Sequence, residues 1–247
     1  MTPRDRFRRA LAHELAVAPE AIDRPATVVV PEDDRAGSGL AVAYAIGQLT
    51  AIRCDPALAP ALAPLSAPDR ALSFEELEAW TGDRDWSVVD GNDNHVLPAG
   101  WAAPTLTVPQ DGTLVDLDTS DATTQQLIAD LVEATGDDDA EEAEVDLEDL
   151  DALAVALLDG DGAIAAFASA RPWDVDETFD DIGVLVHPDR RRGGWGTAAV
   201  LALVARSLEL DRHPLYRCNW TVTGSKRLAV GLGFEVACRL LAVAADG

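Results

Sequence analysis

The sequence predicts a mixed α/β protein with a mostly antiparallel sheet flanked by helices, preceded by a smaller and divergent α+β region. Three observations support this fold class. Two apolar segments are joined by Asp159-Gly160-Asp161-Gly162, a strong signal for a β-hairpin. After this hairpin, apolar segments of strand length alternate with segments of helical periodicity. Before residue 112, in contrast, prolines interrupt the pattern and leave only short apolar runs.

Residues 1–112 form the first predicted region. A polar helix is expected to begin at Thr2 and Pro3, and a second helix at Ser73, whose capping box Glu76 completes. The short apolar runs predict strands, which lie at residues 27–30, 40–45 and 86–89. The pattern changes near Gly112, so we expect a domain boundary there.

Residues 113–247 form the second predicted region, in which the periodicity is clearer. Residues 113–117 alternate as a strand does, and Ser120 with Asp121 precedes a helical run with one apolar face. Pro188 ends one strand and Pro214 ends one helix. The other expected elements are strands at 153–158, 163–170, 181–186, 215–222 and 234–243, and helices over about 195–210 and from Ser225.

The charge of the chain excludes several classes of function. Its 44 acidic and 19 basic residues give a formal charge of −25, which argues against nucleic acid or an anionic membrane as a partner. No run of about 18 apolar residues suggests a membrane span, and the N-terminus does not resemble a signal peptide. The three cysteines form no CxxC pair, so we expect a cytoplasmic protein with no disulfide framework and no metal site.

The acidity is densest at residues 137–151, which hold ten carboxylates and no basic residue. One interpretation is a solvated loop whose charges repel one another. The other is an acidic rim that attracts a substrate carrying an amine. The sequence leaves both open.

The stretch from Arg190 to Gly196 carries the clearest chemical signal. Three arginines and three glycines stand here between a buried strand and a helix. Glycines let backbone N–H groups approach an anion closely, and the first turn of a helix adds unpaired donors and the positive end of its dipole. The arginines supply positive charge in an acidic protein. The stretch therefore predicts a site for phosphate or pyrophosphate.

Spacing separates this loop from two common phosphate-binding motifs. A Walker A loop requires G-x-x-x-x-G-K-[ST], but the only lysine, Lys226, lacks the upstream glycine. A dinucleotide-binding turn requires G-x-G-x-x-G, and the third glycine is missing after both Gly37-Ser38-Gly39 and Gly194-Trp195-Gly196.

The spacing R-x-x-G-x-G does fit, because Arg191 is followed by Gly194 and Gly196, and Val186-x-Pro188 precedes them. With these residues the chain resembles the GNAT superfamily of N-acetyltransferases, whose signature loop binds the pyrophosphate of acetyl-CoA. The resemblance covers residues 113–247. It includes a second motif, formed by Asn219, Ser225, Arg227-Leu228-Ala229 and Leu232-Gly233-Phe234.

The resemblance implies which residues hold acetyl-CoA, the co-substrate. Backbone amides of the loop would bind the pyrophosphate, and the strand before the loop would line the pantetheine arm. Asn219 would face the cofactor from the next strand. The implied cofactor-binding residues are Val184, Leu185, Val186, Arg191, Arg192, Gly193, Gly194, Trp195, Gly196, Thr197 and Asn219.

The implied reaction is transfer of the acetyl group to a primary amine by direct attack on the thioester. It requires a base, for which Asp180, Asp181 and Glu177 are the candidates, and a backbone N–H near Val184 or Leu185 that stabilises the oxyanion. Many family members carry a tyrosine as general acid where this chain has Ala229, and Tyr216 is the candidate substitute. The sequence does not distinguish among the three carboxylates.

Three functional hypotheses follow. The first is an N-acetyltransferase acting on a small-molecule or peptide amine, with residues 1–112 covering the acceptor side or forming a homodimer. The second is a regulatory module that binds CoA or acyl-CoA without turnover, which the missing tyrosine permits. The third is a toxin-like enzyme acting on aminoacyl-tRNA, which the negative charge disfavours.

Overall fold

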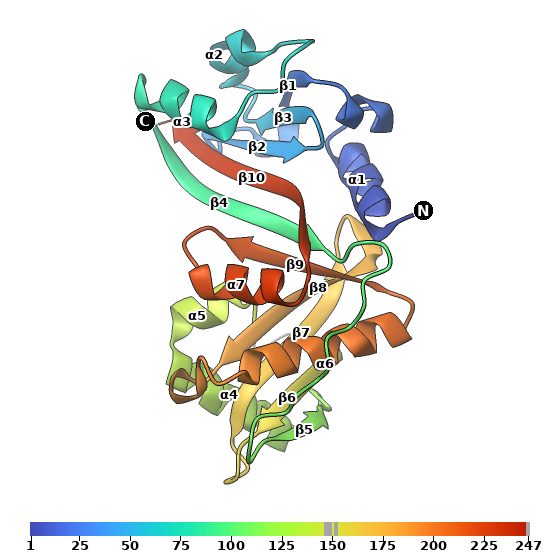
Figure 1. The fold of residues 1–247 in the computed structure, drawn as a ribbon. Coiled ribbons are helices and arrows are strands. Elements are labelled where there is room, and N and C mark those ends of the chain that lie inside the picture. Colours follow the sequence, from blue (N-terminus) through green and yellow to red (C-terminus); the bar gives the residue numbers. More distant parts are fainter. Residues whose placement is uncertain (146–149, 151–152, 246–247) are drawn as a thin grey trace. The chain divides into compact units, whose positions relative to one another are not determined.

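The computed structural model describes residues 1–145, 150 and 153–245 (Figure 1). The chain forms two compact units, each interrupted in sequence. Unit 1 comprises Met1–Ala99, Arg217–Lys226 and the residues from Glu235 onward, and unit 2 comprises Gly100–Tyr216 and Arg227–Phe234. Each unit is a sheet with helices, as the mixed α/β prediction requires. None of the helices in these described ranges has both the length and the apolar character needed to cross a membrane.

The sheet of unit 2 has the strand order β9-β8-β7-β6-β5. The hairpin predicted at residues 159–162 joins β6 to β7, and these strands pair antiparallel, as do β5 with β6 and β7 with β8. Among the described strands of this unit, only β8 and β9 pair in parallel. The strands are β5 (Thr113–Asp116), β6 (Leu153–Leu158), β7 (Ile164–Trp173), β8 (Asp176–Val186) and β9 (His213–Asn219), of which β9 crosses into unit 1 after Tyr216.

Helices pack on both faces of this sheet. Leu185 of β8 packs with Ile128 and Leu131 of α4 (Ala122–Thr135), whereas its neighbours Val184 and Val186 face α6 (Trp195–Glu209). Because successive side chains of a strand point to opposite faces, α4 and α6 cover opposite faces of the sheet. The short helix α5 (Asp137–Glu142) lies on the face of α4 and ends against β8.

The sheet of unit 1 has the strand order β1-β3-β2-β10-β4. Its first pair is parallel and the other pairs are antiparallel. The last strand, β10, lies between β2 and β4, so the C-terminal part of the chain completes the sheet that the N-terminal part begins. The strands are β1 (Ala26–Pro31), β2 (Leu40–Ile46), β3 (Leu49–Cys54), β4 (Trp86–Val96) and β10 (Glu235–Ala245).

The helices of unit 1 begin where capping predicted. The Thr2 hydroxyl accepts from the Asp5 amide at the start of α1 (Pro3–Glu14), and the capping box of Ser73 and Glu76 opens α3 (Phe74–Gly82). The proline-rich segment contains the one-turn helix α2 (Ala59–Leu62). The expected strand at 86–89 is longer than predicted, because β4 continues through polar residues to Val96.

A buried carboxylate allows β4 to continue. Asp93 is buried and accepts a hydrogen bond from Trp220 Nε1 at 2.8 Å. Lys226 Nζ lies 3.1 Å from its Oδ2, and Arg239 Nε lies 3.5 Å from its Oδ1. A charged residue can occupy a buried strand position when its oxygens are paired in this way. Hydrophobic alternation does not detect such a strand.

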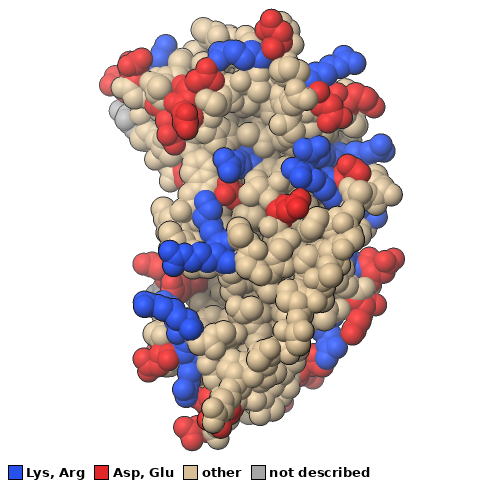
Figure 2. Space-filling view, viewed as in Figure 1, with Lys and Arg blue, Asp and Glu red and all other residues tan. Residues whose placement is uncertain are grey.

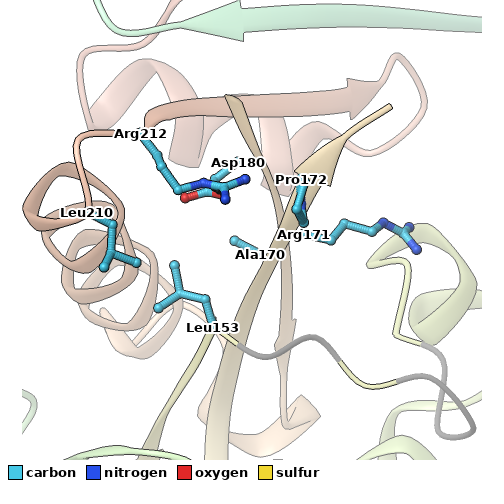
Figure 3. A pocket seen from close by; sticks show the side chains of 7 residues that line it. All are labelled: Leu153, Ala170, Arg171, Pro172, Asp180, Leu210 and Arg212. Atoms are coloured by element: carbon cyan, nitrogen blue, oxygen red, sulfur yellow. Dashed lines mark ion pairs between the residues drawn. The ribbon is translucent and has the colours of Figure 1, made fainter. Parts of the chain in front are cut away.

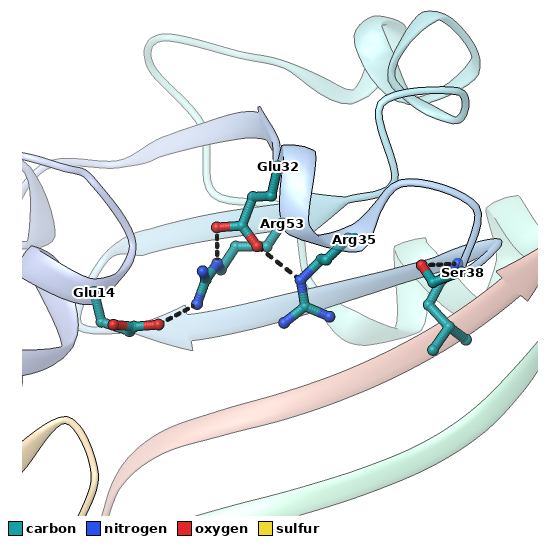
Figure 4. A network of polar contacts seen from close by, with 6 residues as sticks. Glu14, Glu32, Arg35, Ser38 and Arg53 are labelled. Atoms are coloured by element: carbon teal, nitrogen blue, oxygen red, sulfur yellow. Dashed lines mark hydrogen bonds and ion pairs between the residues drawn. The ribbon is translucent and has the colours of Figure 1, made fainter.

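Ion pairs also connect α1 to the edge of the unit 1 sheet (Figure 4). Arg53 of β3 contacts Glu32, which follows β1, and its Nη1 lies 2.7 Å from Glu14 Oε1 at the end of α1. Arg35 Nε donates to the other oxygen of Glu32 at 2.7 Å. The network joins the neighbouring residues Glu32 and Arg35 to Glu14 and Arg53, which belong to other elements.

We predict that Gly183→Ala destabilises the protein by about 1–3 kcal/mol, because a Cβ at this position of β8 would overlap the carbonyl oxygen of Ala143. Chemical denaturation monitored by circular dichroism measures the change in unfolding free energy. Gly160→Ala is the matched control, since its Cβ would meet only the Asp111 Cβ at 4.0 Å. Equal stabilities of the two variants would contradict the tight packing of α5 on β8.

Candidate active site

Strand β8 is the central element of the candidate site, because its two edges are paired to different extents. Along one edge it pairs with β7 as far as Val186. Along the other edge its register with β9 covers only Phe179–Ile182 and ends at the pair Ile182–Tyr216. Residues 183–186 therefore have a strand neighbour on one side only within unit 2.

The direction of the main-chain groups on this free edge follows from one hydrogen bond. The His187 amide donates to the Ala165 carbonyl of β7 at 3.0 Å. N–H and C=O groups alternate in direction along a strand, so Val184 and Val186 point theirs away from β7, whereas Leu185 points its own toward β7. Arg191 Nε donates to the Val186 oxygen at 3.2 Å, which agrees with this direction. The Val184 N–H thus faces the unpaired edge.

The loop after β8 presents a row of unpaired amides. Arg192 has φ 63° and Gly194 has φ 82°, and Gly194 is the N-cap of α6. From residue 192 to 197, no backbone N–H donates a hydrogen bond within the described part of the chain, and the first bond of the helix runs from Ala198 to Gly194. These donors lie at the start of a 15-residue helix, where the dipole favours an anion.

Gly196 brings the start of α6 close to the sheet. A Cβ at this position would lie 2.9 Å from Val186 Cγ2 and 3.3 Å from Leu228 Cδ1. Trp195 is buried, and Arg190 stacks over its ring with 5.7 Å between the guanidinium carbon and the ring centroid. Trp195 is therefore a packing residue, while Thr197 is exposed on the first turn.

The three arginines of the loop have different partners. Arg190 pairs with Asp159 of the β6–β7 hairpin at 2.9 Å, and the hydrogen bond from its guanidinium lowers the pKa of that carboxyl. Arg191 pairs with Asp139 of α5 at 2.6 Å. Arg192 is exposed and has no ion-pair partner in the described ranges. Figure 2 shows basic and acidic side chains intermixed on the visible face of unit 2.

The predicted carboxylates occupy distinct environments. Asp180 is buried, its Oδ1 lies 2.6 Å from Arg212 Nε, and its Oδ2 accepts from the Ser207 hydroxyl at 2.6 Å. Asp181 is also buried but points to the opposite face of β8, the face of Gly183 and α5. Glu177 is exposed near the start of the strand. These environments depend on contacts with distant residues, so the three carboxylates could not be told apart from the sequence.

A pocket lies beside Asp180 (Figure 3). The ends of β6, β7 and α6 line it, with Arg212 and Asp180 facing each other and the Arg171 guanidinium directed away. Because α6 has 15 residues and rises about 1.5 Å per residue, the pocket is about 20 Å from the glycine loop along the helix. The pocket and the loop are thus separate features of unit 2.

The remaining predicted residues are not gathered at the loop. Tyr216 is buried with its ring 5.7 Å from that of Phe234, and Ala229 is buried as well. Asn219 belongs to unit 1, where its Nδ2 donates to Asp90 at 2.7 Å and its Oδ1 accepts from the Thr221 amide and hydroxyl. The loop residues and residues 183–186 of β8, in contrast, belong to unit 2, where Arg191 Nε donates to the Val186 carbonyl.

The sequence did not reveal which side chains form hydrogen bonds and ion pairs with the predicted site residues. Asp139 and Asp159 bind the loop arginines, and Ser207 and Arg212 bind Asp180. Asp139 belongs to the acidic stretch, which offered ten equivalent carboxylates. Of that stretch, residues 146–149 and 151 lie outside the described residues.

The comparisons with known proteins agree with this geometry. A scan of protein families matches residues 122–232 to the acetyltransferase (GNAT) family. A search of curated proteins finds no match.

Three solved structures have similar folds. The GCN5-related N-acetyltransferase of Sphaerobacter thermophilus has a TM-score of 0.52 at 15% identity, over 69% of this chain and 56% of that one. The GCN5-related N-acetyltransferase of Kribbella flavida has a TM-score of 0.50 at 17% identity, with coverages of 81% and 68%. A GNAT-family acetyltransferase of Colwellia psychrerythraea has a TM-score of 0.53 at 12% identity, with coverages of 79% and 76%.

At these identities the structural matches show the fold alone. Their coverage also shows how much of the chain shares that fold. Residues 113–247 are 135 of the 247 residues, or 55% of the chain. A structural match over 79% or 81% of the chain therefore includes residues before 113. The family match thus identifies residues 122–232 as an acetyltransferase domain of the GNAT family, and the structural matches show its fold.

Proposed function

We propose that this GNAT domain transfers an acetyl group from acetyl-CoA to a primary amine of a small molecule or a peptide. The observation that carries the proposal is the set of unpaired amides at residues 192–197, at the positive end of α6. These donors suit the pyrophosphate of the co-substrate. Arg192 is exposed beside them and has no carboxylate partner in the described ranges, so it is the arginine best placed to add a charged contact.

The free edge of β8 suits the pantetheine arm. Val184 and Val186 direct their main-chain groups toward this edge, where an amide-containing chain can pair with them as a strand would. In this arrangement the Val184 N–H donates to the thioester oxygen. The bond strengthens as negative charge develops on that oxygen in the transition state.

The reaction requires a neutral amine and a route for its proton. The amine nitrogen attacks the carbonyl carbon, a C–N bond forms, the C–S bond breaks, and the electron pair leaves on the sulfur. We assign the proton to Asp181, acting through water, because it is the nearest of the three candidates to Val184 along the strand, whereas Glu177 lies seven residues away. Asp181 is three residues from Val184, about 10 Å along the strand.

The leaving thiolate has no assigned acid in this proposal. Tyr216 is buried against Phe234, and the position where many family members carry a tyrosine is the buried Ala229. A free thiol has a pKa near 8.5, so a thiolate is a tolerable leaving group near neutral pH. Protonation then takes place in solution.

The second candidate function is a CoA-binding module without turnover. The engaged oxygens of Asp180 and the alanine at position 229 favour it, because both remove groups that could transfer protons. Binding of CoA without acetyl transfer to any amine would select this alternative.

The acceptor is proposed to be cationic, such as a polyamine, an aminoglycoside or a basic N-terminal peptide, in keeping with the charge of −25. Two carboxylates of the acidic stretch are already paired, Asp139 with Arg191 and Glu144 with Arg171.

We predict that the protein binds CoA with micromolar affinity and that Gly196→Val weakens binding at least tenfold. The new side chain would push the start of α6 away from Val186 and misplace the amides. Gly194→Val is a second test, because a β-branched residue at φ 82° is strained. Isothermal titration calorimetry measures both, with Gly160→Ala as control. Unchanged affinity in both loop variants would exclude this loop as the pyrophosphate site.

We also predict that substitutions of two neighbouring carboxylates affect different properties, one the catalytic rate and the other the stability. Asp181→Asn is expected to lower kcat about 100-fold or more, with little change in CoA affinity. Asp180→Asn is expected to cost about 1.5–3 kcal/mol of stability, because it breaks a charged and buried hydrogen-bond network, and to change kcat only slightly. Steady-state kinetics and denaturation measure the two effects, and the reverse pattern would contradict the assignment.

A further inference from the structure

An ion pair connects the proposed pyrophosphate loop to the acidic helix α5. Arg191 Nη2 lies 2.6 Å from Asp139 Oδ2, and both side chains are nearly half exposed. The same guanidinium donates through Nε to the Val186 carbonyl. Arg191 thus stays attached to the end of β8 whether or not Asp139 is bound.

The far end of α5 is anchored independently of this ion pair. The Val145 amide donates to Ala140 and the Glu144 amide to Glu141, which closes the helix with Glu144 in the left-handed region at φ 53°. Glu144 also pairs with Arg171 of β7, and the Ala143 carbonyl packs against Gly183. Loss of the Asp139 contact would therefore release the start of α5 without detaching its end.

We propose that Asp139 competes with the phosphates of acetyl-CoA for Arg191, so that binding of the co-substrate exchanges a carboxylate for a phosphate at this guanidinium. The inference rests on the proposed function, because it requires the phosphates to bind at this loop. It assigns to one residue of the acidic stretch a role as an internal competitor.

Two observations favour competition over a bracing role for Asp139. The loop conformation depends on Arg192 and Gly194 at positive φ and on the Arg190–His187 backbone bond, none of which involves α5. An exposed ion pair contributes little to stability, whereas a phosphate carries more charge than a carboxylate and forms stronger hydrogen bonds with arginine. The Arg191–Asp139 pair is therefore easy to exchange.

The competition is confined to Arg191. Asp159, the partner of Arg190, is more buried than Asp139 and also accepts hydrogen bonds from the amides of Asp161 and Ala163 in its own hairpin. Its position is fixed by the turn, so Arg190 remains paired. Arg192 has no carboxylate to lose within the described ranges.

The test uses calorimetry at low ionic strength to compare the CoA affinities of two variants, each of which loses one negative charge. Asp139→Asn is expected to bind CoA about three- to tenfold more tightly than the wild type. Asp138→Asn removes the same charge from the adjacent residue, which is exposed and has no ion-pair partner in the described part of the chain, and is expected to gain less than twofold. In an Arg191→Gln background the advantage of Asp139→Asn over Asp138→Asn should vanish.

The outcomes separate this inference from the proposed function. If the wild type binds CoA and Asp139→Asn binds no more tightly than Asp138→Asn, the competition is refuted while the loop assignment stands. If neither the wild type nor the variants bind CoA, the proposed function fails and this inference with it.

A measurement on the unmodified protein serves as a second test. Hydrogen exchange across residues 137–142 is expected to become faster when CoA is added, because the start of α5 loses its contact, while β6 remains unchanged. Slower exchange of α5 in the presence of CoA would show that Asp139 braces the bound state, and would overturn the proposal.

Discussion

The functional geometry of unit 2 depends on where one ladder of hydrogen bonds stops. Strand β8 pairs with β7 to its end, but its pairing with β9 ends at Ile182. Two residues later, Val184 turns its main-chain groups toward an edge with no strand neighbour in the unit. An unpaired main-chain edge is normally a liability for a protein. Here it leads directly into the loop at residues 192–197, whose amides donate no hydrogen bond within the described residues, and the proposed binding of acetyl-CoA uses both sets of donors.

Parts of this surface follow from local sequence alone. The glycines at 194 and 196 and the strand before them indicated a phosphate loop, and the structure places a left-handed N-cap at Gly194 and close packing at Gly196. Helix α6 was expected over about 195–210 and spans Trp195–Glu209. Such features are predictable because the residues that determine them are neighbours in the chain. The ion pairs of the loop could not be predicted in this way, since Arg191 and Asp139 are 52 positions apart.

Strand β4 and the three carboxylates of β8 show a second limit of sequence reasoning. Residues 90–95 have no hydrophobic side chain, and the contacts of the buried Asp93 with Trp220, Lys226 and Arg239 offset the cost of burying its charge. Asp180 and Asp181 are adjacent and chemically identical, yet the strand turns one toward Ser207 and Arg212 and the other toward the face of α5. The chemistry of such a side chain depends on the face of the sheet to which it points and on partners that are distant in the sequence. The residues next to it in the sequence do not reveal these partners.

The position of β10 has a consequence for how the molecule is made. Residues 1–99 are synthesised well before β10, the strand that lies between β2 and β4. Until then both strands expose edges that β10 will later cover, and such edges invite pairing with other chains. Closing contacts between residues about 150–200 positions apart is also slow. The sheet of unit 1 can therefore be completed only after all of unit 2 has been translated.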